Sequence, residues 1–378
     1  MKVKNTRKIH KRIQYYAEHR KLNTALGIAL SYPISTEEIV FDVPAKLLSF
    51  ASLLRNTMAE GEIYYTEDQA IIATMVMDLL EESIYGAQFF PSIVLDEIFR
   101  SGHVFHKGEL EDNPYYKNIH LKPQRSGKFE ITEEFLRKYE IFMYDTAKPK
   151  FHDVMIPAIG TIDHRFKFPN ILENGKAWMS ITPNEIYTMK EPIQEAAGKV
   201  LTLGCGMGYF AYMTALKDNV ESVTIVEKEQ DVIDLFTSFI LPQFSCKEKI
   251  NIVHADAFDY MENLPDGEYD YCFVDIWTGN IDTVPYLKMK KLCSRFRDTT
   301  ISYWIEDALI STIMGYVHMI IQEELYNTPT YDALKTIGLP DDEEFKVDFL
   351  RDLLKDKEIS KAEDVDYYMD FKNIINLM

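Results

Sequence analysis

A glycine-rich loop at residues 204–208 constrains the fold of this chain more than any other feature. The apolar run Val200-Leu201-Thr202-Leu203 leads directly into Gly204-Cys205-Gly206-Met207-Gly208, and a helical pattern begins at Tyr209. A strand that turns through glycines into a helix is the context that a cofactor-binding loop requires. Side chains at these glycines would block both the turn and the approach of a ligand. The sequence therefore predicts a cofactor site at the end of this strand.

Beyond Gly198, short apolar runs alternate with helical patterns, which is typical of a parallel sheet in a doubly wound α/β fold. We expect strands over residues 199–203, 222–227, 250–254, 269–276 and 299–305. We expect helices over residues 209–217, 230–239, 257–264 and 284–296.

Acidic residues close the second and third of these strands. Glu227 ends the second strand, where a carboxylate can accept both hydroxyls of a ribose. The third strand runs into Asp256 and Ala257, where a carboxylate and a backbone amide can read the edge of an adenine. Together with the glycine loop, this ordered set predicts a nucleoside-containing cofactor.

The stretch 199–275 resembles class I S-adenosylmethionine-dependent methyltransferases, with residues 204–208 as their first motif. The resemblance implies a mostly parallel, Rossmann-like methyltransferase fold, S-adenosyl-L-methionine as cofactor, Glu227 on the ribose and Asp256 on the adenine. It also implies methyl transfer to a small molecule or a protein side chain. A nicotinamide-binding domain would normally carry one more glycine on the helix side, whereas this chain has Tyr209 and Ala211 there.

The fourth strand ends at Asp275, our candidate for the catalytic base. Ligands of open α/β sheets lie outside the carboxyl ends of the strands, and a carboxylate there can accept the proton that leaves the acceptor. Holding the cofactor or capping the next helix is the alternative role for this residue. Methyltransferases usually carry an acidic residue near the amino group of the cofactor, and Thr202 stands at that position here. Residues 178–182 resemble the segment that covers the cofactor in several methyltransferases, which implies that Met179 and Ser180 close over it. Backbone carbonyls, or Ser180 and Thr182, are our candidates for holding the amino group.

The three tryptophans, Trp178, Trp277 and Trp304, fall near predicted strand ends or in the covering segment. Aromatic faces attract cations, so these rings could wall a substrate pocket or stack on a sulfonium. Packing in the core is the alternative.

Two further functions use the same fold. The region from Val220 to Met261 resembles spermidine synthases, aminopropyltransferases that use decarboxylated S-adenosylmethionine. In that family an Asp at the position of Asp275 deprotonates the diamine, and a second acidic residue three positions later helps to bind it. This chain has Thr278 there, and Met207 replaces the family's Asp between the glycines, so methyl transfer is our main prediction. A non-catalytic module that binds S-adenosylmethionine and a partner protein is the third possibility.

Helical patterns flank this predicted cofactor domain. Apolar residues recur at helical spacing over residues 8–101, and the sequence after Asp307 is acidic and helical. Asn174-Gly175 predicts a β-hairpin turn. The tyrosine pair Tyr115-Tyr116 is more typical of amphipathic packing than of a ligand site. We therefore expect a helical accessory or substrate domain over 1–150, a hairpin-like connector over 151–181, the cofactor domain over 182–310 and an acidic helical extension over 311–378.

A helix start is predicted at Thr182-Pro183-Asn184-Glu185. Thr182 suits the N-cap, Pro183 the first helical position and Glu185 the third, a pattern that satisfies the free amides of a helix N-terminus. We expect this helix to run over residues 183–197.

Charge and composition narrow the partners. The net charge of −19 disfavours a nucleic-acid substrate. The exception is the segment Met1 to Lys21, whose eight basic residues face a single acidic one and could contact a polyanion. No apolar run predicts a membrane span or a signal peptide, so we expect a cytoplasmic protein. The four separated cysteines predict neither a disulfide framework nor a metal site, and the oligomeric state stays open.

Overall fold

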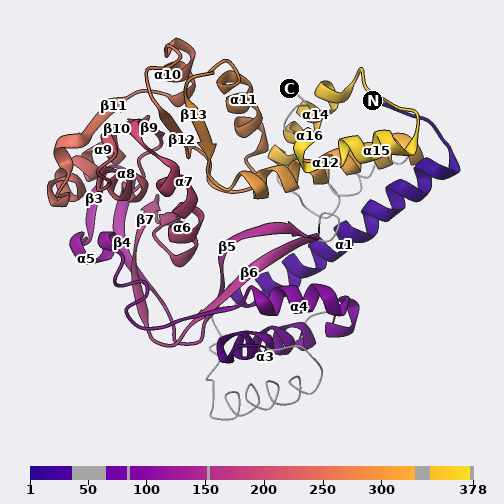
Figure 1. Ribbon diagram of the computed structural model, residues 1–378, viewed down its shortest axis with the longest axis horizontal. Helices are drawn as coiled ribbons and strands as arrows, with labels where there is room; N and C mark the ends of the chain where they lie inside the picture. The colour runs from indigo at the N-terminus through magenta and orange to yellow at the C-terminus, as the bar shows by residue number, and fades with distance from the viewer. Residues whose placement is uncertain (36–64, 83–85, 151–153, 328–340, 375–378) are drawn as a thin grey trace.

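The computed structural model describes residues 1–35, 65–82, 86–150, 154–327 and 341–374 (Figure 1). Its central sheet has five strands in the order β11-β10-β9-β12-β13, and all neighbours run parallel. The strands are β9 (Gly198–Leu203), β10 (Val220–Glu227), β11 (Ile250–His254), β12 (Tyr271–Val274) and β13 (Thr300–Tyr303). The predicted α/β class and the five predicted strands are confirmed. The strand order reverses between β9 and β12, which places a ligand crevice at their carboxyl ends.

Helices cover both faces of this sheet. On one face, α8 (Tyr209–Ala215) and α9 (Gln230–Leu235) pack with Val200 of β9, and on the other, α10 (Ala257–Asn263) and α11 (Thr283–Cys293) pack with Leu201. Successive side chains of a strand point to opposite faces, so an uninterrupted apolar strand buries both. The predicted helix after β10 continues past α9 as a π-helical turn, η3 (Phe236–Ile240).

The helix predicted over 183–197 is broken into α6 (Pro183–Thr188) and α7 (Lys190–Glu195). Pro192 explains the break, because its nitrogen has no hydrogen to donate to the carbonyl of Thr188 in a continuous helix. A proline is tolerated in the first turn of a helix, and α7 starts so that Pro192 falls there.

The N-terminal region begins with helices, as predicted, and then departs from the prediction. Its longer helices are α1 (Arg7–Ser35), α3 (Glu67–Glu82) and α4 (Ser92–Arg100), and the periodic stretch from Val43 to Leu54 lies outside the described residues. After η2 (Ala87–Phe89) and α4, the chain forms mainly strands, so our helical assignment for 1–150 is wrong over 103–150.

These strands form two small sheets. One has the order β2-β6-β5, with β2 (His103–Phe105), β5 (Ile141–Lys150) and β6 (Val154–Ile162). The other has the order β3-β4-β7-β8, with β3 (Gln124–Ser126), β4 (Phe129–Leu136), β7 (Phe166–Glu173) and β8 (Lys176–Ser180). The short helix α5 (Pro114–Asn118) precedes β3. The predicted hairpin turn is confirmed between β7 and β8, where Asn174 and Gly175 both have positive φ.

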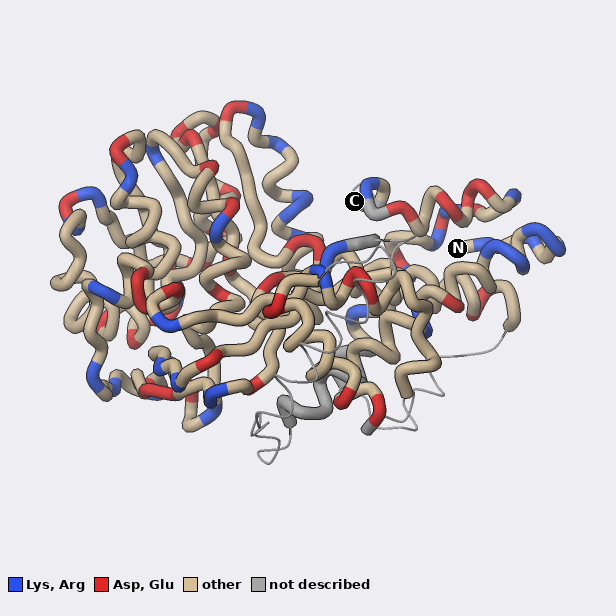
Figure 2. Tube along the Cα trace, turned by 60° about the horizontal axis from the view of Figure 1, so that its bottom comes forward, with Lys and Arg blue, Asp and Glu red and all other residues tan. Residues whose placement is uncertain are grey.

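The C-terminal region is helical and lies against the N-terminal helix (Figures 1 and 2). It contains α12 (Glu306–Tyr326), α14 (Asp341–Leu354), α15 (Ala362–Tyr368) and α16 (Phe371–Ile374). The two-residue strands β1 (Lys2–Val3) and β14 (Glu358–Ile359) pair in parallel. Arg12 contacts Asp366, and Lys4 lies 3.2 Å from Glu358, so the acidic extension neutralises part of the basic N-terminal segment.

No helix in the described part of the chain combines the length and the apolar character needed to cross a bilayer.

Candidate functional site

The glycine loop adopts a conformation that side chains would disrupt. Gly204, Gly206 and Gly208 have φ of 101°, 49° and 71°. A Cβ on Gly204 would lie 2.1 Å from the carbonyl oxygen of Asp275, and one on Gly208 would lie 2.3 Å from Phe236. Two of the three glycines are therefore needed for close approach within the protein. Gly206 instead lies against the side chain of Met179, and both residues line the cavity.

A cavity of about 590 Å³ opens beyond the carboxyl ends of β9, β10, β11 and β12. Its lining includes every residue that we predicted for the site except Gly208: Met179, Ser180, Gly204, Gly206, Glu227, Asp256, Ala257 and Asp275. Gly208 lies behind the loop, where α8 begins. The structure thus brings together residues from β8 and from the ends of four parallel strands.

Glu227 and Asp256 are held by backbone amides. The two oxygens of Glu227 accept from the amides of Cys205, at 3.0 Å, and Glu229, at 2.9 Å. Asp256 is the N-cap of α10 and accepts from the amide of Phe258 at 2.7 Å. These bonds fix the orientation of both carboxylates toward the cavity. We refer to this part of the cavity as the nucleoside end.

The end of β8 and the two residues after it, residues 178–182, lie over the glycine loop, and we call this segment the cover. The terminal carbon of Met179 lies over Gly206, where it would be 2.9 Å from a Cβ at that position. The Ser180 hydroxyl donates to Asn170 Oδ1 at 2.7 Å. Ser180 therefore has a partner within the protein, which leaves Thr182 as the better placed of the two candidates for the amino group of the ligand.

Glu185 lines the cavity, although its place in the sequence predicts a role in capping a helix. Thr182 is the N-cap of α6, but its side chain makes no capping hydrogen bond, and its amide donates to Ser180 instead of meeting Glu185. The Glu185 side chain is only 7% exposed and lines the cavity together with Asp275. The capping prediction for Thr182 and Glu185 is therefore wrong, and it concealed a buried acid.

Glu185 and Asp275 form an acidic end of the cavity. Neither carboxyl takes part in a side-chain hydrogen bond within the described residues. Burial raises the pKa of Asp275 to about 7, with a further contribution from the charge of Glu227. Burial, and then the charge of Asp275, raise the pKa of Glu185 well above its usual range. A carboxylate that is shielded from water without a hydrogen-bond partner is costly, so a bound cation would stabilise the ionised form of either acid.

All three tryptophans line the cavity. Trp277 donates from Nε1 to the carbonyl of Trp304 at 3.0 Å, and Trp304 donates from Nε1 to Thr188 Oγ1 at 2.9 Å. Trp178 packs against Phe129, with 4.9 Å between ring centroids. Because the indole nitrogens of Trp277 and Trp304 are bonded to the protein, these two rings present mainly apolar and π surface to a ligand.

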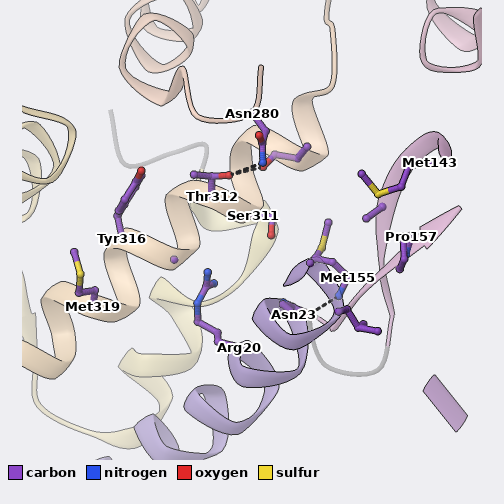
Figure 3. A pocket seen from close by; sticks show the side chains of 15 residues that line it. Arg20, Asn23, Met143, Met155, Pro157, Asn280, Ser311, Thr312, Tyr316 and Met319 are labelled. Carbon is purple, nitrogen blue, oxygen red and sulfur yellow. Dashed lines mark hydrogen bonds between the residues drawn. The ribbon is translucent and has the colours of Figure 1, made fainter. Parts of the chain in front are cut away.

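Hydrogen bonds at Thr278 and at Asn280 fix the loop that follows Asp275. Thr278 donates its amide and its hydroxyl to Asp282 Oδ2, at 2.8 and 2.9 Å. Asn280 donates to Thr312 of α12 at 3.3 Å, beside a second cavity of about 520 Å³ between α1, β5, β6 and α12 (Figure 3). Arg20 of α1 extends toward α12 there, close to Gly315. The hydrogen bonds of Thr278 and Asn280 thus fix the loop after Asp275 and leave the Asp275 side chain free of them.

Residues 185–336 match the spermine/spermidine synthase domain family, a match that starts at Glu185 and spans less than half of the chain. No curated protein matches. The solved structures that are similar include spermidine synthase from Thermotoga maritima, at 18% identity and a TM-score of 0.29, over 39% of this chain and 59% of that one. Another is monomeric WbdD, at 19% identity and a TM-score of 0.24, over 31% of this chain and 28% of that one. This chain thus spans less than two thirds of the spermidine synthase chain, and similarity at this level does not bear on activity.

Proposed function

We propose that this protein is an aminopropyltransferase of the spermidine synthase type, which transfers an aminopropyl group from decarboxylated S-adenosylmethionine to an amine. The observation that carries the proposal is the acidic end of the cavity, where Glu185 and Asp275 lie without hydrogen-bond partners. The family match over residues 185–336 also favours this function over methyl transfer, which was our main prediction.

The two possible donors differ in charge, and this difference bears on which of them the cavity accommodates. Decarboxylated S-adenosylmethionine carries a sulfonium and an ammonium, whereas S-adenosylmethionine carries an additional carboxylate. Of the described residues that line the cavity, Lys228 alone is basic, and it follows Glu227 at the nucleoside end. A carboxylate placed near Glu185 and Asp275 would find no cation there among the described residues and would be repelled by either acid in its ionised form. A donor without that carboxylate, and an amine acceptor, both suit these two acids.

From the sequence, aminopropyl transfer was the alternative to methyl transfer, because Thr278 replaces an acidic residue that helps to bind the diamine and Met207 replaces an Asp between the glycines. Glu185 offers a replacement from a different element, since α6 carries it into the same cavity as Asp275. The second acid of the site would then come from before the glycine loop rather than from after β12.

Asp275 is the candidate base for this reaction. Its raised pKa suits a group that takes a proton from an ammonium near neutral pH. The freed amine attacks the aminopropyl carbon bonded to sulfur, the carbon–sulfur bond breaks, and its electron pair stays on sulfur as methylthioadenosine leaves. Glu185 would hold the positive charge of the acceptor or of the donor's amino group beside this reaction.

The product distinguishes the two transferases. The purified protein is incubated with each donor and a panel of linear diamines and polyamines, and the nucleoside products are identified by mass spectrometry. We expect methylthioadenosine and a lengthened amine from the decarboxylated donor. The Asp275→Asn variant should form almost none of either product. S-adenosylhomocysteine as the sole product, formed from S-adenosylmethionine, would overturn the proposal in favour of methyl transfer.

A further inference from the structure

The short helix α5 carries two adjacent tyrosines that reach opposite sides of the cavity. Asn113 caps this helix by accepting from the amide of Tyr115 at 2.9 Å, and the helix packs against α8. Adjacent residues of a helix point about 100° apart, so Tyr115 and Tyr116 are directed to different neighbours.

Tyr115 holds the glycine loop. Its side chain is 1% exposed, and its hydroxyl donates to the carbonyl of Met207 at 2.7 Å. Met207 lies between Gly206 and Gly208, where the backbone has positive φ on both sides. A buried hydroxyl bonded to this carbonyl fixes the orientation of the peptide group in the middle of the loop.

Tyr116 holds the cover. Its hydroxyl donates to the carbonyl of Ile181, the residue that joins Ser180 of β8 to Thr182. Ile181 is fully buried, and its amide donates to Pro169 of β7 at 3.0 Å. The backbone of the cover is therefore fixed from two directions, once by the sheet and once by α5.

We propose that Tyr115 and Tyr116 are positioning residues that set the distance between the glycine loop and the cover, and so determine the affinity for the nucleoside of the donor. The inference rests on the proposed function only in taking this cavity as the donor site. Neither hydroxyl belongs to a residue that lines the cavity, so both act through the backbone that they hold.

The test compares Tyr115→Phe and Tyr116→Phe with a matched control, Tyr212→Phe. Tyr212 is also buried, and its hydroxyl accepts from Asn118 of α5 at 2.9 Å, but this bond touches neither the loop nor the cover. Methylthioadenosine binding is measured by calorimetry and global stability by denaturant unfolding. Each of the first two variants should weaken binding about three- to tenfold, the range expected for one hydrogen bond, whereas the control should bind like wild type.

Steady-state kinetics provide a second measurement. The KM for the donor should rise in Tyr115→Phe and Tyr116→Phe, while kcat and the KM for the amine stay at wild-type values. Unchanged donor affinity in both variants, or an equal loss in Tyr212→Phe, would overturn the inference. A wild-type protein that binds methylthioadenosine but transfers no aminopropyl group would contradict the proposed function and leave the binding comparison decisive for these tyrosines.

Discussion

The two ends of the cavity treat their carboxylates differently. At the nucleoside end, both oxygens of Glu227 accept backbone amides, and Asp256 caps a helix. At the acidic end, Glu185 and Asp275 have no such bonds among the described residues, and burial raises the pKa of both. The nucleoside end is thus organised before a ligand arrives, whereas the acids of the acidic end are stabilised by protonation or by a bound cation. Specificity for the acceptor should therefore reside at the acidic end.

Replacement of Asp275 by Asn should have the largest effect on turnover. Loss of a general base typically reduces kcat by about 10²–10⁴-fold, while the isosteric Asn leaves the nucleoside end intact. We expect methylthioadenosine affinity to stay within about twofold of wild type, measured by calorimetry beside the kinetic assay. Asp234→Asn, at an exposed acid on α9, is the control. Equal losses of binding and turnover in Asp275→Asn would contradict the division between the two ends.

Gly206→Val should abolish detectable nucleoside binding, a loss of at least about 100-fold. The valine side chain would collide with the terminal carbon of Met179, which lies 2.9 Å from the Cβ position, and the residue would keep a strained positive φ. Gly267→Val separates backbone strain from the steric collision. Gly267 also has a positive φ, 77°, but a Cβ there would make an ordinary contact with Asp298, at 3.6 Å. The control should lose stability without losing affinity. If it loses affinity as well, backbone strain rather than the steric collision explains the result at Gly206.

Glu227→Ala should weaken nucleoside binding by about 1.5–3 kcal/mol, the range for a hydrogen bond to a charged group. The substitution also frees the amide of Cys205, so the glycine loop loses a support. Asp256→Ala should cost less, because Glu227 can accept both ribose hydroxyls, whereas Asp256 shares the adenine edge with a backbone amide. Calorimetry with methylthioadenosine measures both. A larger loss in Asp256→Ala than in Glu227→Ala would reverse our assignment of ribose and adenine contacts.

Glu185→Gln should change the pH dependence of stability. The pKa of Glu185 is raised in the folded protein, so above about pH 4.3 the unfolded chain releases a proton that the folded chain retains. Wild-type stability should fall as pH rises from about 5 to 8, and the variant should lose less stability over the same interval. Denaturant unfolding at both pH values measures this, and a saturating diamine should narrow the difference. A pH-independent difference would mean that Glu185 is not stabilised in its protonated form.

Much of the fold and part of the site could be predicted from the sequence because their signals are local. Each strand of the central sheet is a short apolar run next to its own helix, and the glycine loop directly follows one of them. The strands β4 and β5 were missed because their partners β7 and β6 come later in the chain, and antiparallel pairing leaves little trace in a single strand. Glu185 was missed for the opposite reason, since a local capping pattern gave it a sufficient explanation.

The pairing of Lys2–Val3 with Glu358–Ile359 has a consequence for the order in which the chain can fold. During synthesis β1 leaves the ribosome long before its partner β14 is made. The apolar side of α1 is likewise made long before α12 and α15, the helices that pack against it. Contacts this distant in sequence form late and slow folding. The nascent chain should therefore keep Ile9 and Ile13 accessible to chaperones until the last helices have emerged.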